Sequence, residues 1–521
     1  MFDFDALVIG SGFGGAVTSC RLAEKGYRVL VLERGQRWDP TNFPRKADAP
    51  WVFDVGNPVT RHGWFDFRIF RNMTVVQGAG VGGGSLVYAN ISIPAKKATF
   101  DAGWPAEITF SGLADHYATV GKMLNVSKVP ETQWPERTKL VRDAANAAGF
   151  GDKFQPLELA VTFDKDWNYQ LPNPHAPARS VMKDNGHGKM QGTCVHLGNC
   201  DIGCDVNARN TLDLNYLADA EKHGAEIRPL HLVNGIEPHD GGYRVRFSRI
   251  DSGTMVPGSA TARLVIVAAG SLGSTELLLR CRAAQTLPGL SARLGLGWSS
   301  NGDFLTPAIH PFRHVDPSHG PTITAAIDLL DHGADGQDVF IEDGGFPDLV
   351  SGLLRRQASS PPSDPFARTI VESLRPLLAA NLLTDHVMPW FAQARDAADG
   401  RLFLNDSGRL DLQWDIAKSR ETMDAVVHMH QRLAALTQGM ALTPLTWTVA
   451  HDLITPHPLG GCNMAATAGT GVVDHKGEAF GHRNLFVADG AIVPKAIGLN
   501  PSRTIAALAE HIASVIVAEG R

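Results

Sequence analysis

The sequence contains no apolar run long enough to cross a membrane, and it has little cysteine, with six cysteines in 521 residues. A membrane-spanning helix needs about 20 consecutive apolar residues, so stable membrane insertion is not expected. Cysteines this sparse do not make a disulfide framework, which favours a reducing compartment. The chain opens with MFDFDALVIG, which has acids where a secretory signal has basic residues, so we expect a cytoplasmic protein.

Neither sign of charge is in strong excess, because 48 Lys and Arg stand against 54 Asp and Glu, for a formal net charge of -6. Nucleic-acid-binding chains usually carry a basic surplus, so no nucleic-acid partner is expected. Also absent are the H-E-x-x-H pattern of zinc proteases, the P-loop and the G-x-S-x-G nucleophile elbow. The length exceeds what one compact core needs and predicts two or more packed units.

What is present begins with a pattern typical of dinucleotide binding. ALVIG predicts a buried strand, SGFGGAVTSCRLAEKG a helix and YRVLVLERG a second buried strand. Gly10, Gly12 and Gly15 form G-x-G-x-x-G between the first strand and the helix, and Glu33 ends the second strand. The glycines admit a pyrophosphate at the helix N-terminus, and the acid binds ribose hydroxyls. Because Glu33 suits a ribose without a 2′-phosphate, the pattern predicts FAD or NAD.

A second glycine-rich stretch favours one of these two cofactors. Residues 75–93, VVQGAGVGGGSLVYANISI, hold a run of small residues between two apolar segments. We therefore expect this backbone to lie in packed structure against a ligand, rather than in a flexible surface loop. A second ligand-contacting loop is more than a simple nicotinamide domain needs. The prediction is an extended, tightly held FAD.

Near the C-terminus, His457 opens the stretch HPLGGCNM. Pro458 disfavours helix at the residue before it, so the imidazole is expected on extended backbone. From this stretch alone, the simpler interpretation is that His457 is one polar residue of a glycine-containing turn, without a catalytic role. Further on, NLFVADGAIVP predicts a strand and a turn at Gly490. Asn500 and Pro501 then stand where a helix begins, with Asn500 at the N-cap.

The sequence resembles the glucose-methanol-choline (GMC) flavoprotein oxidoreductases, and within them the cholesterol oxidase-like branch. The matching pieces are, in order, VIGSGFGGAV, LERG, GAGVGGGSLV, HPLGGC and NLFVADGAIVPKAIGLNPSRTIAALAEHIA. The resemblance implies an α/β fold in two parts. A discontinuous, Rossmann-like FAD-binding domain would comprise residues 1–92, 190–310 and 455–521. An α+β substrate-binding domain containing an antiparallel sheet would comprise residues 93–189 and 311–454.

The resemblance also implies a reaction and its site residues. FAD would oxidise an alcohol to a carbonyl by taking a hydride at N5. The substrate would be a sterol-like apolar alcohol, and oxygen or a carrier would accept the electrons. His457 and Asn500 would face the substrate hydroxyl, and His457 would take or relay its proton. The residues predicted to contact FAD are Gly10, Gly12, Phe13, Gly14, Gly15, Glu33, Gly84, Ala89, Asn90, Ile91, Val233, Asp489, Gly490 and Asn500.

Glu342 is the third catalytic candidate. It ends the strand-like part of VFIEDGGFP, five residues before Pro347, and a solvated turn carboxylate is its plain interpretation. The resemblance matches it to a glutamate that moves a proton during double-bond isomerisation of sterols. Enclosed in an apolar pocket, the carboxyl would have a raised pKa, which suits proton transfer near neutrality.

Two positions depart from the best-known cholesterol oxidases, which have asparagine where this chain has Tyr88 and phenylalanine where it has Ser502. Both lie near the flavin edge in the family, so an aryl or other bulky alcohol is the alternative substrate. A flavin- or lipid-binding protein without turnover is the alternative class, but mere binding needs neither His457 nor Asn500.

Two further stretches carry no functional signal. The cysteines at 194, 200 and 204 and His196 lack the usual spacing of metal ligands, so no metal site is expected. Residues 374–400, LRPLLAANLLTDHVMPWFAQARDAADG, predict a buried helix followed by a turn.

Overall fold

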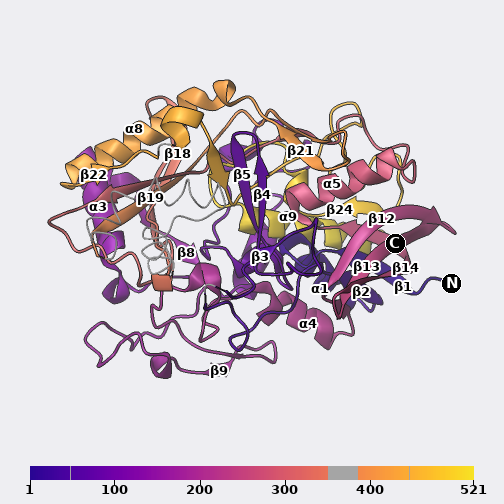
Figure 1. Cartoon of the computed structure of the whole chain (residues 1–521), viewed down its shortest axis with the longest axis horizontal. Coiled ribbons are helices and arrows are strands. Elements are labelled where there is room, and N and C mark those ends of the chain that lie inside the picture. The colour runs from indigo at the N-terminus through magenta and orange to yellow at the C-terminus, as the bar shows by residue number, and fades with distance from the viewer. Residues whose placement is uncertain (47, 350–384, 445) are drawn as a thin grey trace.

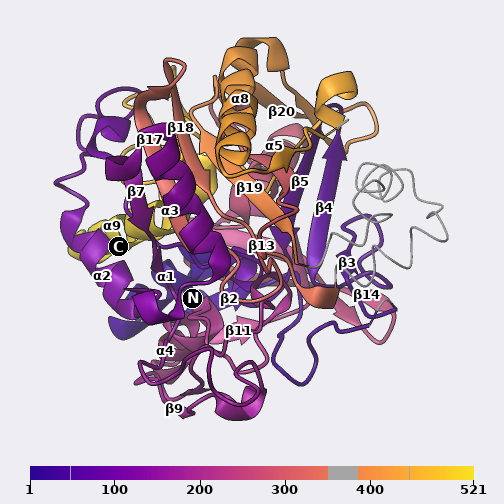
Figure 2. The ribbon, with the colours of Figure 1, turned by 90° about the vertical axis from the view of Figure 1, so that its left-hand side faces the viewer.

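The structure is a computed structural model, and it describes residues 1–46, 48–349, 385–444 and 446–521. Two sheets dominate it. In Figure 1 one lies on the right, where both chain ends are found, and the other lies at the upper left. A smaller four-stranded sheet contains β4 and β5, which lie between the two in Figure 1 and to the right of β19 in Figure 2.

The right-hand sheet has seven strands and is parallel at its centre. β1 (Phe4–Ile9) pairs in parallel with β2 (Val29–Leu32) and with the end of β14 (Thr254–Val267). These strands read as unbroken apolar runs because layers cover both faces of a parallel sheet. The remaining strands are β11 (Glu226–Arg228), β12 (His231–His239), β13 (Gly242–Asp251) and β24 (Leu485–Val487).

Helices from both ends of the chain cover this sheet. α1 (Phe13–Glu24) follows β1 directly, and it packs against α9 (Ser502–Ala518) and α4 (Tyr216–Lys222). β24 pairs with β14 in parallel, so the C-terminal segment completes the sheet that the N-terminal segment begins. The predicted strand, glycine turn and helix at the N-terminus are confirmed, as is the Rossmann-like α/β fold.

The upper-left sheet has six strands in the order β22-β16-β19-β18-β17-β7, and every pair in it is antiparallel. Helix α8 (Arg420–Leu436) packs against β16, β18 and β19, and α3 (Glu136–Ala148) packs against β17, β7 and α8. The strands are β7 (Phe154–Pro156), β16 (Phe304–Ile309), β17 (Ala325–Ala334), β18 (Gln337–Glu342), β19 (Val387–Ala394) and β22 (Met440–Ala441).

The division of the chain into two sets of segments stays a prediction. β16 belongs to the antiparallel sheet although it lies inside the segment 190–310 that was assigned to the FAD-binding domain. This pairing favours a boundary before residue 304.

The helix predicted over 374–400 is wrong where the structure describes that segment, because residues 387–394 form β19; residues 374–384 lie outside the described residues. A continuous apolar run does not distinguish a buried helix from a central strand. Here Pro389 disfavours helix, and it lies directly opposite Pro307 of β16, so the two missing N–H donors share one position of the ladder.

The smaller sheet contains β3 (Val52–Phe53), β4 (Phe65–Phe70), β5 (Met73–Gly78) and β23 (Leu453–Thr455). The two other long helices of the described residues are α2 (Ala114–Met123) and α5 (Gly270–Ala283). Within the described residues, no helix has the length and apolar character required to cross a membrane.

Candidate active site

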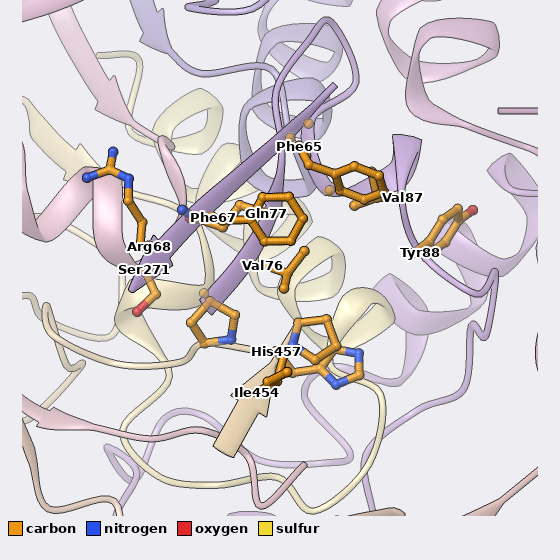
Figure 3. Close-up of a pocket in the computed structure, with 18 of the residues that line it drawn as sticks. Phe65, Phe67, Arg68, Val76, Gln77, Val87, Tyr88, Ser271, Ile454 and His457 are labelled. Carbon is orange, nitrogen blue, oxygen red and sulfur yellow. The ribbon is translucent and has the colours of Figure 1, made fainter. Parts of the chain in front are cut away.

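A cavity of about 1700 Å³ is lined by residues of the seven-, six- and four-stranded sheets. At one end it reaches the carboxyl ends of β1 and β2, where open α/β sheets bind their ligands. Pockets for single small ligands usually measure roughly 300–1,000 Å³, so this cavity has room for a dinucleotide and a second molecule. Figure 3 shows part of its wall, with Phe65, Phe67 and Val76 from β4 and β5 and His457 below them.

Glu33 is fixed at the nucleotide end of the cavity. Its carboxylate accepts hydrogen bonds from the backbone N–H of Ser11 (3.0 Å), the Ser11 hydroxyl (2.7 Å) and the backbone N–H of Gly35 (2.9 Å). The side chain is nearly buried and still lines the cavity. This places an acceptor beside the glycine turn, as binding of ribose hydroxyls requires.

The glycines of this turn have two different roles: the packing of the fold requires some of them, and one leaves room for a ligand. A Cβ at Gly14 would lie 1.7 Å from the carbonyl oxygen of Ala488, and one at Gly15 would lie 2.0 Å from that of Gly10, so the fold itself needs both. At Gly12 the nearest protein atom would be 3.9 Å away, which leaves the N-terminus of α1 open toward the cavity. A backbone cradle at a helix N-terminus fits a pyrophosphate.

The second glycine-rich loop lies against the first. A Cβ at Gly83 would come within 2.5 Å of the Cα of Gly12, so the two turns are in backbone contact. Arg209 fixes this loop from behind by donating hydrogen bonds to the carbonyl oxygens of Ser85, Leu86 and Tyr88 and to the side chain of Asn90. The sequence contained no signal for Arg209, because an isolated arginine in a loop forms no pattern.

His457 lies at the other end of the cavity, two residues beyond β23. Its Nδ1 is 2.9 Å from Oδ1 of Asp303, whose carboxylate has no exposed surface. Its ring is partly exposed and faces the cavity (Figure 3). Asp303 was not predicted from the sequence, since it is 154 positions from His457 and belongs to no motif.

Asn500 also lines the cavity, but the expectation that it caps the last helix is wrong. α9 begins at Ser502, and the residue that flanks it is Pro501, which adopts a helical backbone conformation. Asn500 is therefore one position too early to cap, and its Oδ1 has no hydrogen-bond partner among the described residues. Because this oxygen is buried, the polar atoms of Asn500 reach a ligand in the cavity only after the side-chain amide rotates.

Glu342 ends β18, as predicted, and lies next to Asn500 with no exposed surface, so it is not a solvated turn carboxylate. Burial raises its pKa well above the ordinary value, and the neighbouring Asp343 adds to this rise. The side chains of Gln393, which donates a hydrogen bond at 2.9 Å, and of Asn500 oppose it. The net effect is a raised pKa, because burial outweighs these two hydrogen bonds.

Most of the predicted site residues thus meet in one cavity. Gly15 and Asn90 instead lie behind its wall, together with Glu342: Gly15 packs on Gly10, and Asn90 accepts a hydrogen bond from Arg209. The predicted residues that line the cavity are Gly10, Gly12, Phe13, Gly14, Glu33, Gly84, Ala89, Ile91, Val233, His457, Asp489, Gly490 and Asn500.

Both departures from the family pattern also line the cavity. The Tyr88 hydroxyl donates to the carbonyl oxygen of Asn210 (3.2 Å), and the Ser502 hydroxyl donates to that of Ile91 (2.9 Å). Because both hydroxyls are used inside the protein, these positions present mainly carbon atoms to a ligand.

A glycine-rich dinucleotide site that opens into an apolar cavity with an imidazole at its far end is the arrangement expected of a flavoprotein oxidoreductase. Family models described as GMC oxidoreductase and as NAD(P)-binding Rossmann-like domain match residues 396–509 and 8–58. A cholesterol oxidase of Acinetobacter baumannii is 31% identical, with 99% of this chain and 95% of that protein covered. One of Mycobacterium tuberculosis is 31% identical, with 98% and 91% covered. The chain belongs to the GMC oxidoreductase family, in its cholesterol oxidase-like branch.

Solved structures share the fold at much lower identity. Pyridoxine 4-oxidase from Mesorbium loti is 15% identical with a TM-score of 0.63, and 99% of each chain is covered. A fungal aryl-alcohol oxidase is 16% identical with a TM-score of 0.59 over the full length of both chains. By its family membership, the protein is an FAD-dependent oxidoreductase that acts on CH–OH groups.

Proposed function

We propose that this protein oxidises a sterol-like apolar alcohol to its ketone and passes the electrons to oxygen. The observation that carries the proposal is the single cavity that joins the glycine cradle to a largely apolar wall ending at His457 and Asn500. Phe67, Val76 and Ile454 belong to that wall and favour a large hydrocarbon ligand over a small polar one. The cholesterol oxidases that match nearly the whole chain support the same substrate class.

In the proposed reaction, FAD supplies a hydride acceptor. Residues Gly12 to Gly14 would hold its pyrophosphate, Glu33 would bind its ribose, and the loop around Gly84 would contact the rest of the molecule. His457 accepts the hydrogen bond of the substrate hydroxyl and takes the proton that leaves the oxygen. After an amide rotation that turns its NH₂ group toward the cavity, Asn500 donates a hydrogen bond to the oxygen of the same hydroxyl and so orients it. The apolar wall excludes water from the reacting carbon.

An anaerobic reduction assay tests the function. The purified protein should be yellow with about one FAD per chain, and a 5-ene-3β-hydroxysteroid should bleach the flavin faster than aryl or long-chain alcohols. Admission of air should restore the colour within seconds if oxygen is the acceptor. If an aryl alcohol bleached the flavin fastest, the substrate would be an aryl alcohol and not a sterol. Slow recovery of the colour in air would indicate that a carrier accepts the electrons. If no alcohol bleached the flavin, the protein would bind flavin without turnover.

A second expectation concerns Glu342, for which we propose the proton transfer of sterol isomerisation. Since the carboxyl is buried and does not line the cavity, transfer requires a change of side-chain rotamer to bring it to the substrate. Glu342→Gln should still reduce FAD with a 5-ene-3β-hydroxysteroid but release mainly the unconjugated ketone, as judged by chromatography of the products. Glu421→Gln, at an exposed position on α8, is the control and should match the wild type.

The pH dependence of the product ratio follows from the raised pKa of Glu342. Only the ionised carboxylate removes a proton from carbon, so isomerisation should be slow below this pKa and should accelerate as the pH rises through it. The conjugated share of the product should therefore increase with pH in the wild type. A high and pH-independent conjugated share in both the wild type and Glu342→Gln would remove Glu342 from the reaction.

A further inference from the structure

Asp303 makes more contacts with the His457 segment than a single ion pair requires. Its Oδ1 lies 2.9 Å from Nδ1 of the imidazole, while its Oδ2 accepts from the backbone N–H of His457 (3.2 Å) and from the Thr455 hydroxyl (2.5 Å). One buried carboxylate thus binds both the ring and the main chain of the same residue. Such a two-point contact fixes the side chain as well as the backbone that carries it.

The contact also selects one form of the neutral imidazole. An ionised carboxylate only accepts hydrogen bonds, so the ring must place its hydrogen on Nδ1 to use Asp303. The lone pair then lies on Nε2, which has no hydrogen-bond partner among the described residues and belongs to a ring that lines the cavity. That nitrogen is the one that a substrate hydroxyl can reach.

The turn that carries Asp303 holds the second catalytic candidate too. The Asn301 side chain accepts from the backbone N–H groups of Ile497 (3.0 Å) and Gly498 (2.9 Å), and it donates to the carbonyl oxygen of Leu499 (3.0 Å). Asn500 is the next residue. Two neighbouring side chains of one turn therefore hold the segments of His457 and Asn500, which come from different parts of the chain.

We infer that Asp303 is a positioning residue for alcohol oxidation: it holds His457 as the Nδ1–H tautomer and stabilises the imidazolium that forms when Nε2 takes the substrate proton. The turn of residues 301–303 sets the separation of His457 from Asn500. This inference rests on the proposed role of His457 as proton acceptor. The turn increases the rate by keeping His457 and Asn500 aligned to within a fraction of an ångström.

The substitution Asp303→Asn tests the inference in the holoenzyme. Its amide has nearly the same shape but can donate to Nδ1, which moves the ring hydrogen to Nε2 and blocks the lone pair. Anaerobic stopped-flow reduction should show a limiting rate lowered by roughly 10²-fold or more, with the dissociation constant of the alcohol changed by less than about threefold. FAD content should equal that of the wild type.

Asp396→Asn is the matched control. Asp396 is also buried and supports the same region, accepting from the Ser299 hydroxyl (2.7 Å) and from the backbone N–H of Ser300 (2.8 Å), but it does not contact His457. It should lower the melting temperature yet reduce its flavin within a few-fold of the wild-type rate. An equal loss of rate in both variants would mean that Asp303 acts only through folding, and a wild-type rate in Asp303→Asn would also overturn the inference.

Nitrogen NMR of the wild-type holoenzyme labelled with ¹⁵N-histidine tests the tautomer even if Asp303→Asn does not fold. The His457 signals, assigned by their loss in His457→Gln, should show the hydrogen on Nδ1 at a pH where the ring is neutral. Hydrogen on Nε2 would overturn the inference. A fast His457→Gln variant would instead contradict the proposed role of His457 itself, so the two failures are distinguishable.

Discussion

Replacing His457 with alanine should slow the reduction of bound flavin by an alcohol by roughly 10²-fold or more, the usual scale for loss of a positioned acid–base group. The residue lines the cavity but makes none of the contacts that shape the glycine cradle, so FAD should remain bound. The substrate hydroxyl would then have no group to take its proton, while the apolar wall that binds the hydrocarbon would be unchanged. The measurement is the limiting rate in anaerobic stopped-flow reduction, with flavin absorbance as the record of cofactor content.

The control for this experiment is His332→Ala, since that side chain is 75% exposed and lies outside the cavity wall. It should reduce its flavin at the wild-type rate. Reduction of His457→Ala at the wild-type rate with the same alcohol would contradict the role proposed for the imidazole. A His457→Ala protein that had lost its FAD would show instead that the residue supports the cofactor.

The second large effect separates two glycines of the same turn. Gly14→Ala should abolish folding or destabilise the protein by several kcal/mol, because its Cβ would overlap backbone atoms of Ala488 that have no rotamer to yield. Gly12→Ala should fold, since the residue has an ordinary φ of -71° and open space around its Cβ. That methyl group would occupy the cradle, and FAD affinity should fall at least about tenfold.

The comparison requires the melting temperature of each apoprotein and the FAD titrated back into it. Gly26→Ala supplies a reference, because a Cβ there meets no atom within 4 Å and only the positive φ of 82° adds strain. If Gly12→Ala bound FAD as tightly as the wild type, the pyrophosphate would have to lie elsewhere in the cavity. If Gly14→Ala were as stable as the wild type, Gly14 would not be packed as closely against the backbone of Ala488 as the structure shows.

The N-terminal part of the fold could be predicted because its determinants are local. The strand, the glycines and Glu33 lie within one short segment, and each obeys a rule of backbone geometry or burial. The helix prediction at β19 was wrong because the determinants there are not local. A strand buried on both faces has a continuous apolar run because of neighbours far away in the chain. Asn500 was misplaced by one residue, which is within the usual error for a helix end.

The site was only partly accessible from the sequence. His457 and Asn500 were proposed through the family resemblance, and both line the cavity. Glu342 is buried, but beside the polar side chains of Gln393 and Asn500 rather than in the apolar wall. Asp303 and Arg209 were missed, because each acts through contacts made across long stretches of chain and is surrounded by no recurring pattern. Such residues become visible only when the distances between side chains are known.

The pairing of β24 with β14, beside β1, sets the order of events during biosynthesis. Synthesis proceeds at about 5–20 residues per second, so β24 leaves the ribosome roughly half a minute or more after β1. Until then β14 has an apolar edge without its partner, and α1 has not met α9. The nascent chain therefore has to be kept from aggregating until its C-terminal segment has been made, because only then can the sheet and its helix layer be completed.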